Sequence, residues 1–352
     1  MAFSVEEFGK MPDGEDVYRY TISNEQGVSA SFTDLGAVWL TMVVPDRDGN
    51  MADVVLGYDT VENIMTQSGH PGEPVGRNAN RIGGGKFTLN DVTYELALNN
   101  AGKNNIHSGP DFYRDRLWET VVMETDLGTR VEFSLTSPDG DQGYPGNADI
   151  VVAYTLTPDN SLVLEYNMVS DADTIANFTN HAYFNLGGHD SGCAMAHKVW
   201  IDADAFTIAD ETSVPTGELV PVKGTPMDFT QMKPIAQDID ADYEPLKMAK
   251  GYDHNWALNH EKGELALSAK VEDEVSGRTM EVYTDLPGIQ FYTANNFNTD
   301  KGKNGTTYHG RDGYCFETQY FPDAINKPQF DSPVLLAGEE YQTTTIYKFG
   351  VK

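Results

Sequence analysis

The sequence is poor in cysteine and in long apolar runs. Only two of its 352 residues are cysteines, Cys193 and Cys315, and they lack the close spacing of a metal-binding or redox pair. So few thiols favour a reduced, cytoplasmic protein over a disulfide scaffold. No stretch approaches the ~20 apolar residues of a membrane span, and the first residues, MAFSVEEFGK, lack the basic and apolar parts of a signal peptide. The sequence therefore predicts neither membrane insertion nor secretion.

Positive charge is also scarce. The chain has 24 Lys and Arg residues against 54 Asp and Glu residues, a formal net charge of -30. Such a charge repels nucleic acids and anionic membranes and weakens encounters with phosphorylated substrates. We therefore expect no nucleic-acid partner, no membrane partner and a neutral small-molecule ligand. The acidic residues are spread along the chain, a pattern typical of a solvated surface.

Repeats of fixed length and low-complexity segments are missing as well, and helical periodicity is confined to short pieces. Instead, β-branched and aromatic residues alternate or cluster between Gly, Pro, Asn and Asp, which predicts strands joined by short turns. Such strands are expected within residues 28–46, 92–99, 130–140, 148–160, 161–171, 198–210, 264–273, 278–296 and 341–349. Short helices are expected at Val61–Gln67 and Gln231–Ile239. The prediction is one all-β domain, residues 1–352, folded as a large antiparallel β-sandwich.

Several common catalytic signatures are absent too. No G-x-S-x-G elbow and no HExxH pattern occurs, and the glycine run in GRNANRIGGG, residues 76–85, has no Lys-Ser/Thr after it to make a phosphate loop. Arginine also serves as a fork donor to hydroxyls or as a structural partner. Of Arg77 and Arg81, we expect one to be structural and the other functional.

The stretch FTNHAYFNLGG, residues 178–188, is the most informative part of the chain. It places His181 among amides and aromatics, which would make a poor core strand because every buried amide or imidazole needs a partner. We interpret it as the wall of a polar cleft. His107 lies in a loop rich in Asn and Gly, where it is either a surface residue or part of the same site.

Two further strands carry polar side chains. Asp253 and His254 are adjacent, so only one of them can easily face a cleft if they lie on a strand. Gln290, between apolar neighbours, is either a buried structural amide or a ligand donor.

Glu317 stands on an otherwise apolar and aromatic strand, YCFETQYF. Carboxylates are rarely buried, and an apolar setting raises a carboxyl pKa towards the range useful for proton transfer. Glu317 is therefore the best general-base candidate. The residues His107, His181, Asp253 and His254 are of metal-binding types, but no metal-type spacing supports them. We expect neither a metal nor an organic cofactor.

Taken together, six motifs resemble those of the aldose 1-epimerase (galactose mutarotase) family. They are GRNANRI, IHSGP, FTNHAYFNLGG, GYDHNWAL, PGIQFYTANNF and FETQYFPDAINKPQF, and they follow the family's order over nearly the whole chain. The resemblance implies a β-supersandwich and cofactor-free interconversion of the α and β anomers of free aldohexoses such as galactose and glucose.

The resemblance also implies roles for individual residues. Glu317 matches the base that removes the C1 hydroxyl proton, His181 the acid that protonates the ring oxygen, and His107 a second histidine near that oxygen. Residue chemistry alone allows the two histidines to exchange roles. Nearby carboxylates such as Asp253 are expected to keep the acid protonated. The positions matching sugar-hydroxyl binders are Arg81, Asp253 and Gln290, with Asn80 and Tyr183 beside them.

One departure concerns Ser108, which stands where the family commonly has glycine after the first histidine. It either restricts the loop or adds a hydroxyl near the sugar. Two alternatives stay open at this stage: a hexose-6-phosphate epimerase of similar fold, which would need more basic residues at its pocket, and a non-catalytic carbohydrate-binding sandwich. A monomer or a weak homodimer is expected.

Overall fold

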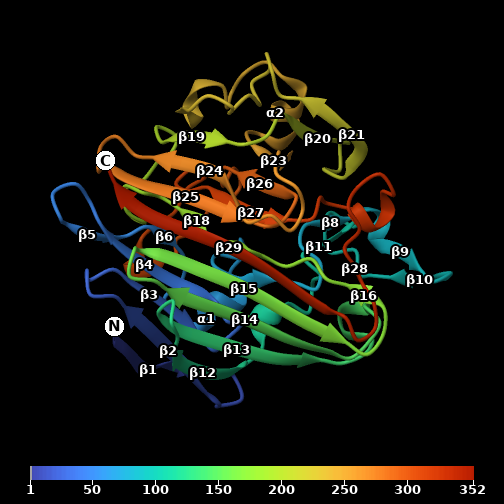
Figure 1. The fold of residues 1–352 in the computed structure, drawn as a ribbon, viewed down its shortest axis with the longest axis horizontal. Helices are drawn as coiled ribbons and strands as arrows, with labels where there is room; N and C mark the ends of the chain where they lie inside the picture. Colours follow the sequence, from blue (N-terminus) through green and yellow to red (C-terminus); the bar gives the residue numbers. More distant parts are fainter. Residues whose placement is uncertain (1) are drawn as a thin grey trace.

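The largest sheet runs through the whole molecule. The computed structural model describes residues 2–352, and in it nine antiparallel strands lie side by side (Figure 1). In spatial order they are β12 (Glu119–Glu124), β13 (Thr129–Ser137), β14 (Ala148–Leu156), β15 (Ser161–Ser170), β29 (Glu340–Val351), β25 (Arg278–Thr284), β24 (Ala266–Glu272), β19 (Lys198–Ile201) and β22 (Lys233–Pro234). Because the C-terminal β29 lies between β15 and β25, the sheet joins segments far apart in the sequence.

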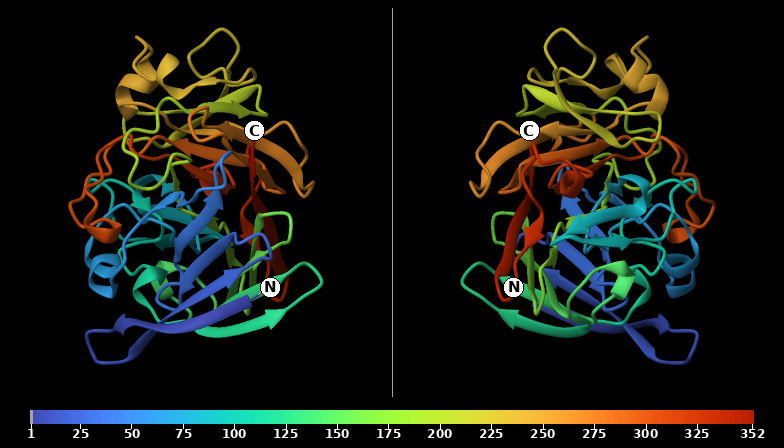
Figure 2. Two further views of the ribbon diagram at one scale, coloured as in Figure 1. Left: turned by 90° about the vertical axis from the view of Figure 1, so that its left-hand side faces the viewer. Right: turned by 90° about the vertical axis from the view of Figure 1, so that its right-hand side faces the viewer.

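Two five-stranded sheets and five short ladders complete the β-structure. The first sheet is β1 (Ala2–Lys10), β2 (Asp16–Ser23), β3 (Ser29–Thr33), β4 (Trp39–Pro45) and β5 (Met51–Asp53); the second, in spatial order, is β21 (Pro215–Pro221), β20 (Ala205–Ala209), β23 (Asp253–Ala257), β26 (Gly288–Tyr292) and β27 (Cys315–Gln319). The ladders pair β6 (Val55–Leu56) with β18 (Tyr183–Phe184), β7 (Pro74–Val75) with β17 (Thr179–Asn180), β8 (Arg81–Ile82) with β11 (Asn105–Ile106), β9 (Lys86–Leu89) with β10 (Val92–Glu95), and β16 (Thr174–Ile175) with β28 (Val334–Leu335). Figure 2 shows the nine-stranded sheet edge-on, with the blue strands and the cyan and orange loops gathered on one side of it. The predicted large antiparallel sandwich is confirmed.

The core fills the space between these sheets. Along β29 buried and less buried residues alternate, as expected when one face of a strand is covered. Tyr347 of β29 packs 5.0 Å from the ring of Phe184 and 5.6 Å from that of Trp39 on β4, which ties the large sheet to the N-terminal one. On β26, Phe291 stacks on Phe316 of the neighbouring β27 at 5.0 Å.

Helix is confined to short pieces. The expected helix near residue 61 is confirmed as α1 (Val61–Thr66), which begins where the Thr60 hydroxyl accepts a hydrogen bond from the Asn63 amide. The helix expected at Gln231–Ile239 is wrong, because Lys233 pairs with Val199 in the large sheet and Pro234 has no amide proton to donate. A second helix, α2 (Glu244–Ala249), was not anticipated and carries Pro245 in its first turn.

Single 3-10 turns complete the helical elements: η1 (Gly83–Gly85), η2 (Tyr113–Asp115), η3 (Asp141–Gly143), η4 (Ile235–Gln237), η5 (Lys303–Gly305) and η6 (Ala324–Asn326). Within the described residues, no helix has the length and apolar character needed to cross a membrane.

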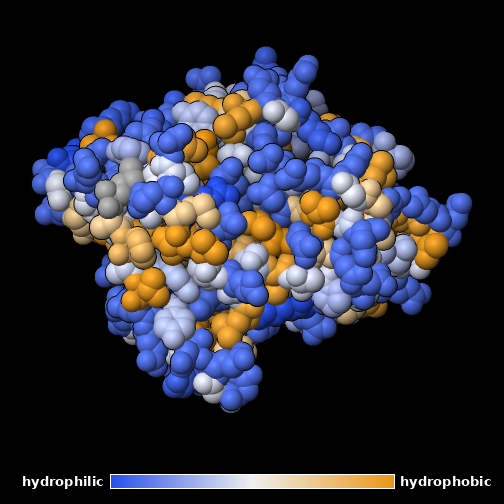
Figure 3. All heavy atoms as spheres, turned by 60° about the horizontal axis from the view of Figure 1, so that its bottom comes forward, coloured by the Kyte–Doolittle hydropathy of each residue, from blue (hydrophilic) through white to orange (hydrophobic). Residues whose placement is uncertain are grey.

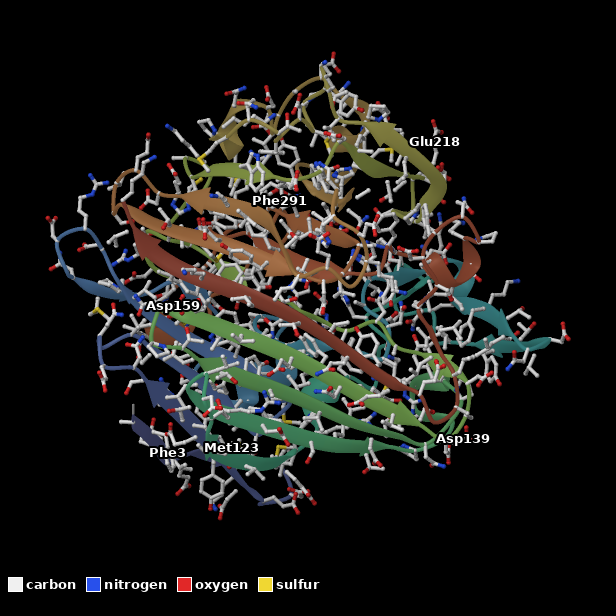
Figure 4. The ribbon with its side chains drawn as sticks, in the orientation of Figure 1. Phe3, Met123, Asp139, Asp159, Glu218 and Phe291 are labelled. Carbon is white, nitrogen blue, oxygen red and sulfur yellow. The ribbon has the colours of Figure 1, made fainter. Side chains whose placement is uncertain are left out.

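Most carboxyl groups lie at the surface of the molecule, since only five of the 54 Asp and Glu residues are buried. Asp139, Asp159 and Glu218 project from its outer parts in Figure 4, whereas Phe291 lies inside. The face drawn in Figure 3 is mostly hydrophilic, interrupted by a band of apolar residues. This distribution agrees with the expectation that most of the negative charge is solvated.

Replacing Phe291 with alanine tests the core beneath the site. The ring is fully buried among aromatic neighbours, so Phe291→Ala is expected to lower the free energy of unfolding by about 3–5 kcal/mol, measured by urea denaturation. Val275→Ala, at a side chain that is 89% exposed, is the matched control and should change it little. A loss below about 1 kcal/mol for Phe291→Ala would contradict the packing described here.

Candidate active site

A polar cavity of about 210 Å³ lies between the β23–β26–β27 part of the second five-stranded sheet and the loops that face it. Every site residue predicted from the sequence lines it, except Gln290. The lining residues are Gly69, His70, Asn80, Arg81, Ile106, His107, His181, Tyr183, Asp253, Tyr292, Asn296 and Glu317. Segments separated by more than 200 residues in the sequence therefore meet in one pocket.

The sheet wall follows from strand register. Gln290 of β26 lies opposite Glu317 of β27, and Asp253 of β23 lies opposite Tyr292 of β26. The Gln290 side-chain amide donates a hydrogen bond of 2.7 Å to the carboxylate of Asp253. Gln290 therefore lies on the same sheet face as Glu317 and Asp253, and although it does not line the cavity it holds the carboxylate of Asp253.

The neighbouring residues Asp253 and His254 separate as expected for a strand. Asp253 faces the pocket, whereas the His254 ring packs 6.0 Å from Phe206 and 6.3 Å from Trp256. Burial lowers the pKa of His254 to about 4, so this imidazole is a neutral core residue. The prediction that only one of the pair can face the cleft is confirmed.

His181 lies immediately after β17 and reaches across to Glu317. Its backbone is fixed by two hydrogen bonds, since its amide donates to the Glu73 carbonyl at 2.9 Å and its carbonyl accepts from the Gly72 amide at 3.1 Å. The His181 Nε2 lies 3.7 Å from Oε1 of Glu317. Its Nδ1 lies 3.5 Å from the Cys315 sulfur, two residues before Glu317 on the same strand face.

His107 is held by the short β8–β11 ladder. The His107 amide donates a hydrogen bond to the Asn80 carbonyl at 3.0 Å, and the Asn80 amide donates one to the His107 Nδ1 at 3.2 Å. Because Nδ1 accepts a hydrogen bond in this contact, the neutral ring carries its hydrogen on Nε2. His107 therefore offers an N–H donor.

Arg77 and Arg81 have different surroundings, as expected. The Arg77 guanidinium is fully buried and donates to the carbonyls of Ser137 and Pro145, so it is structural. Arg81 lines the pocket, and its Nε donates to the Asn100 side chain at 3.2 Å. Its remaining N–H groups are the fork donors closest to the cavity.

Aromatic residues form the rest of the wall. Tyr183 stacks on Phe297 with 4.6 Å between ring centroids, and its hydroxyl donates to the Gly69 carbonyl at 2.7 Å. Phe297 is thus behind Tyr183, whereas Tyr292 lines the cavity itself. Sequence reasoning missed Tyr292, although it lies two residues after Gln290 on the same face of a strand. It also missed His70, for which no local signal was recognised.

Ser108 does not add a hydroxyl to the pocket. The side chain is fully buried, accepts a hydrogen bond from the Asn78 amide at 2.9 Å, and lies 3.1 Å from both the Asn78 carbonyl, to which it donates, and the Tyr144 hydroxyl, from which it can accept. It therefore clamps the His107 loop to the Asn78 segment. Of the two readings offered by the sequence, restriction of the loop is the one the structure supports.

Burial dominates the electrostatics of the site. It raises the pKa of Glu317 well above its ordinary value, and the charge of Asp253 adds to this effect. Burial lowers the pKa of His181 to about 3, with the neighbouring His70 adding to the shift, and it lowers the pKa of His107 in the same way. The expectation that carboxylates keep His181 protonated is therefore wrong for the free site, where loss of hydration outweighs them.

Three of these groups also have the chemistry of a metal site. Donor atoms of His107, His181 and Glu317 lie within 4.8 Å of one another. Ligands about 2.0–2.1 Å from a zinc ion would be about 3.3 Å apart, so the three would have to close in. His107 presents an N–H rather than a lone pair in its neutral tautomer. The geometry thus fits hydrogen bonding to oxygen atoms better than metal binding.

The fold and the site together define a class of enzyme. A β-sandwich carries a small pocket in which a buried carboxylate faces an imidazole, with amide, guanidinium and carboxylate groups around them and tyrosine rings on one side. This arrangement suits proton transfer to and from a small polyhydroxylated ligand.

Comparison with known proteins identifies the family. Residues 18–348 match the family model described as aldose 1-epimerase. The chain is 40% identical to a galactose mutarotase of Bos taurus, covering 98% of this chain and 97% of the relative, and 35% identical to an aldose 1-epimerase of Escherichia coli, covering 96% of each. The solved structure of a galactose 1-epimerase from Lactobacillus acidophilus superposes with a TM-score of 0.87 at 27% identity, over 99% of both chains.

This chain belongs to the aldose 1-epimerase family. It is thus an isomerase that interconverts anomers, and the resemblance drawn from its motifs is confirmed.

Ser108→Ala tests the clamp on the His107 loop. Removing the hydroxyl leaves the buried Asn78 amide and Tyr144 hydroxyl short of a partner, so we expect a loss of about 1–3 kcal/mol in unfolding free energy, measured by urea denaturation. Ser4→Ala, at an exposed position on β1, serves as the control. If Ser108→Ala left stability unchanged but altered the choice between sugars, the hydroxyl would act in the pocket instead.

Proposed function

We propose that this enzyme interconverts the α and β anomers of free aldohexoses such as galactose and glucose, with Glu317 as general base and His181 as general acid. The observation that carries the proposal is the state of the Glu317 carboxyl. It is 2% exposed, its Oε1 lies 3.7 Å from His181, and its Oε2 has no hydrogen-bond partner among residues 2–352. A buried polar oxygen without a partner is costly, so a ligand hydroxyl is its natural partner.

The reaction needs one base and one acid. Glu317 takes the proton of the C1 hydroxyl as the bond between C1 and the ring oxygen breaks, and His181 gives a proton to that oxygen. The open-chain aldehyde then turns about the C1–C2 bond, and the hydroxyl adds to its other face as both protons return. Each group is expected to contribute about 10²–10⁴-fold to the rate.

The pKa shifts suit a pair that shares one proton. In the free site, burial favours a neutral carboxyl on Glu317 and a neutral imidazole on His181. That is the proton state left after ring opening, when the carboxyl holds the proton from C1 and the imidazole has given its own away. To open the cyclic sugar, Glu317 must be ionised and His181 protonated, which is again a total of one proton. The positive charge of Arg81 favours this state because it lowers the pKa of Glu317. The cycle therefore ends with no net gain or loss of protons.

Recognition of the sugar is expected to rest on groups around this pair. Arg81 and His107 supply N–H donors, and Asp253, held by Gln290, supplies an acceptor. Asn80 stands beside Arg81, with its side-chain oxygen bound to the Arg81 amide at 2.9 Å. Tyr183 and Tyr292 offer apolar surfaces for a pyranose face.

The rival functions are less well supported. Among the described residues that line the pocket, Arg81 is the single lysine or arginine, which is little positive charge for a sugar phosphate. A binding module would have no need for a buried carboxyl with a raised pKa beside an imidazole. Action as one domain, as a monomer or weak homodimer, and in the cytoplasm stay predictions that accompany the proposal.

Polarimetry of freshly dissolved α-D-galactose and α-D-glucose is the direct test of the activity. The purified protein should speed the approach to the same final rotation at neutral pH without added metal. The ratio of the two rates gives the preference between the hexoses. If neither sugar responded, the function would shift to a phosphorylated or oligomeric substrate, or to binding alone.

Glu317→Gln and His181→Asn test the catalytic pair. Each removes one proton-transfer group while keeping a similar shape, so each should lower kcat by about 10²–10⁴-fold with an unchanged circular dichroism spectrum. Glu218→Gln, at an exposed residue of β21, is the matched control and should behave as the wild type. Near-normal turnover in either site variant would remove that residue from the mechanism.

The pH dependence of kcat/KM reports on the same pair. Activity requires that Glu317 and His181 together hold one proton. Activity should fall at low pH, towards the His181 pKa of about 3, because the pair then holds two protons. It should fall at high pH, above the raised pKa of Glu317, because the pair then holds none. We expect the acid limb to lie well below the ordinary histidine pKa of 6.5, with folding checked by circular dichroism at each pH. An acid limb near 6.5, the ordinary histidine value, would contradict the described burial.

A further inference from the structure

His70 is a third histidine in the pocket wall. Its ring centroid lies 5.4 Å from that of His107, 6.0 Å from that of His181 and 4.7 Å from that of Phe112. The proposed mechanism gives it no task, although it lines the cavity. A polar ring in this place needs an explanation of its own.

One nitrogen of this ring is already occupied. The His70 Nδ1 lies 2.6 Å from Oε2 of Glu73, a carboxyl that is only 2% exposed and also lies 3.9 Å from Arg114. A carboxylate accepts hydrogen bonds, so Nδ1 carries the hydrogen and the neutral ring keeps a lone pair on Nε2. Within residues 2–352, no side chain or backbone group bonds to Nε2, so this acceptor is left for a ligand.

The loop that carries His70 is held in place from several sides. The hydroxyls of Tyr58 and Tyr183 each donate at 2.7 Å to the carbonyls of Ser68 and Gly69. The Glu73 amide bonds to the His70 carbonyl, and the Glu73 carbonyl accepts from the His181 amide. The positions of His70 and His181 are therefore fixed relative to each other.

We infer that His70, through its Nε2, accepts a hydrogen bond from the hydroxyl of the C5 substituent of the sugar. His181 lies next to both groups, with its Nε2 3.7 Å from Glu317 and its ring 6.0 Å from that of His70. His70 lies outside the cluster of Glu317, His181 and His107 donor atoms that are within 4.8 Å of one another, so the order along the wall is Glu317, His181, His70. In a pyranose, the C1 hydroxyl, the ring oxygen and the C5 substituent follow one another in the same order. This inference rests on the proposed roles of Glu317 at the C1 hydroxyl and His181 at the ring oxygen.

The inference makes His70 a determinant of specificity. An aldohexose carries a hydroxymethyl group at C5, whereas the corresponding aldopentose has hydrogen there. D-galactose and L-arabinose form one such pair, and D-glucose and D-xylose form another. The His70 acceptor would be satisfied by the hexose of each pair and left empty by the pentose, so it favours the hexose.

Two substitutions distinguish the role of the His70 Nδ1 from that of its Nε2. In His70→Asn the side-chain NH2 group takes the place of Nδ1 and keeps the bond to Glu73, while the side-chain oxygen ends short of the position of Nε2. In His70→Gln the longer side chain places its oxygen near Nε2 instead. We expect His70→Asn to lower the hexose-to-pentose ratio of kcat/KM about 10-fold for both sugar pairs, with His70→Gln recovering part of the loss.

The wild type and a matched control make the result unambiguous. His309→Asn makes the same change at an exposed histidine and should keep the wild-type ratio. An unchanged ratio in His70→Asn, or an equal loss on hexose and pentose, would overturn the inference while wild-type turnover upheld the proposed function. If the wild type lacked turnover, calorimetric binding of the same sugars would still decide: a hexose preference that His70→Asn abolishes supports the inference, and one that it keeps overturns it.

Discussion

The site depends on the burial of one carboxyl group. Glu317 lies on β27, a strand otherwise made of buried residues, and loss of hydration there raises its pKa. A buried ionised carboxylate without partners would be strongly destabilising, so the proton is retained until a ligand offers hydrogen bonds. The neighbouring groups follow from this constraint: the His181 Nε2 lies 3.7 Å from one oxygen, and the other oxygen is buried without a hydrogen-bond partner among residues 2–352. The fold therefore holds a buried carboxyl oxygen without a protein partner beside the imidazole of His181.

The facing wall is positioned by backbone hydrogen bonds rather than by long secondary structure. Asn80 and His107 both adopt positive φ angles, 60° and 53°, in the tight turns where they exchange hydrogen bonds. Such conformations cost energy for residues other than glycine and persist where the surroundings determine them. The buried Arg77 supplies part of that determination, since its guanidinium binds carbonyls of two other segments. Rigid loops of this kind hold hydrogen-bonding groups to the precision that proton transfer needs.

Much of this could be read from the sequence, because strands repeat with period two. Alternation predicted that only one of Asp253 and His254 faces the cleft, which the structure shows to be Asp253, and an acid on an apolar strand marked Glu317. Other features depend on the folded surroundings. The sequence of residues 231–239 favours a helix, but in the fold Lys233 pairs with Val199 of β19. The neutral state of His181 follows from its burial, which the local sequence pattern does not predict. Gln290 has the right residue type and the right strand face, but its side-chain amide is bound to Asp253 and it does not line the cavity.

The three pocket histidines show how one residue type serves different purposes. Each ring has two nitrogens, and the partner of the first decides what the second offers. An amide proton on Nδ1 of His107 makes its Nε2 a donor, whereas a carboxylate on Nδ1 of His70 makes its Nε2 an acceptor. At His181 the Nδ1 faces the Cys315 thiol, a neutral S–H group because burial raises its pKa, and the Nε2 lies towards Glu317. A sugar presents both hydroxyl protons and oxygen lone pairs, so a wall with donors and an acceptor in fixed places can distinguish one arrangement of hydroxyls from another.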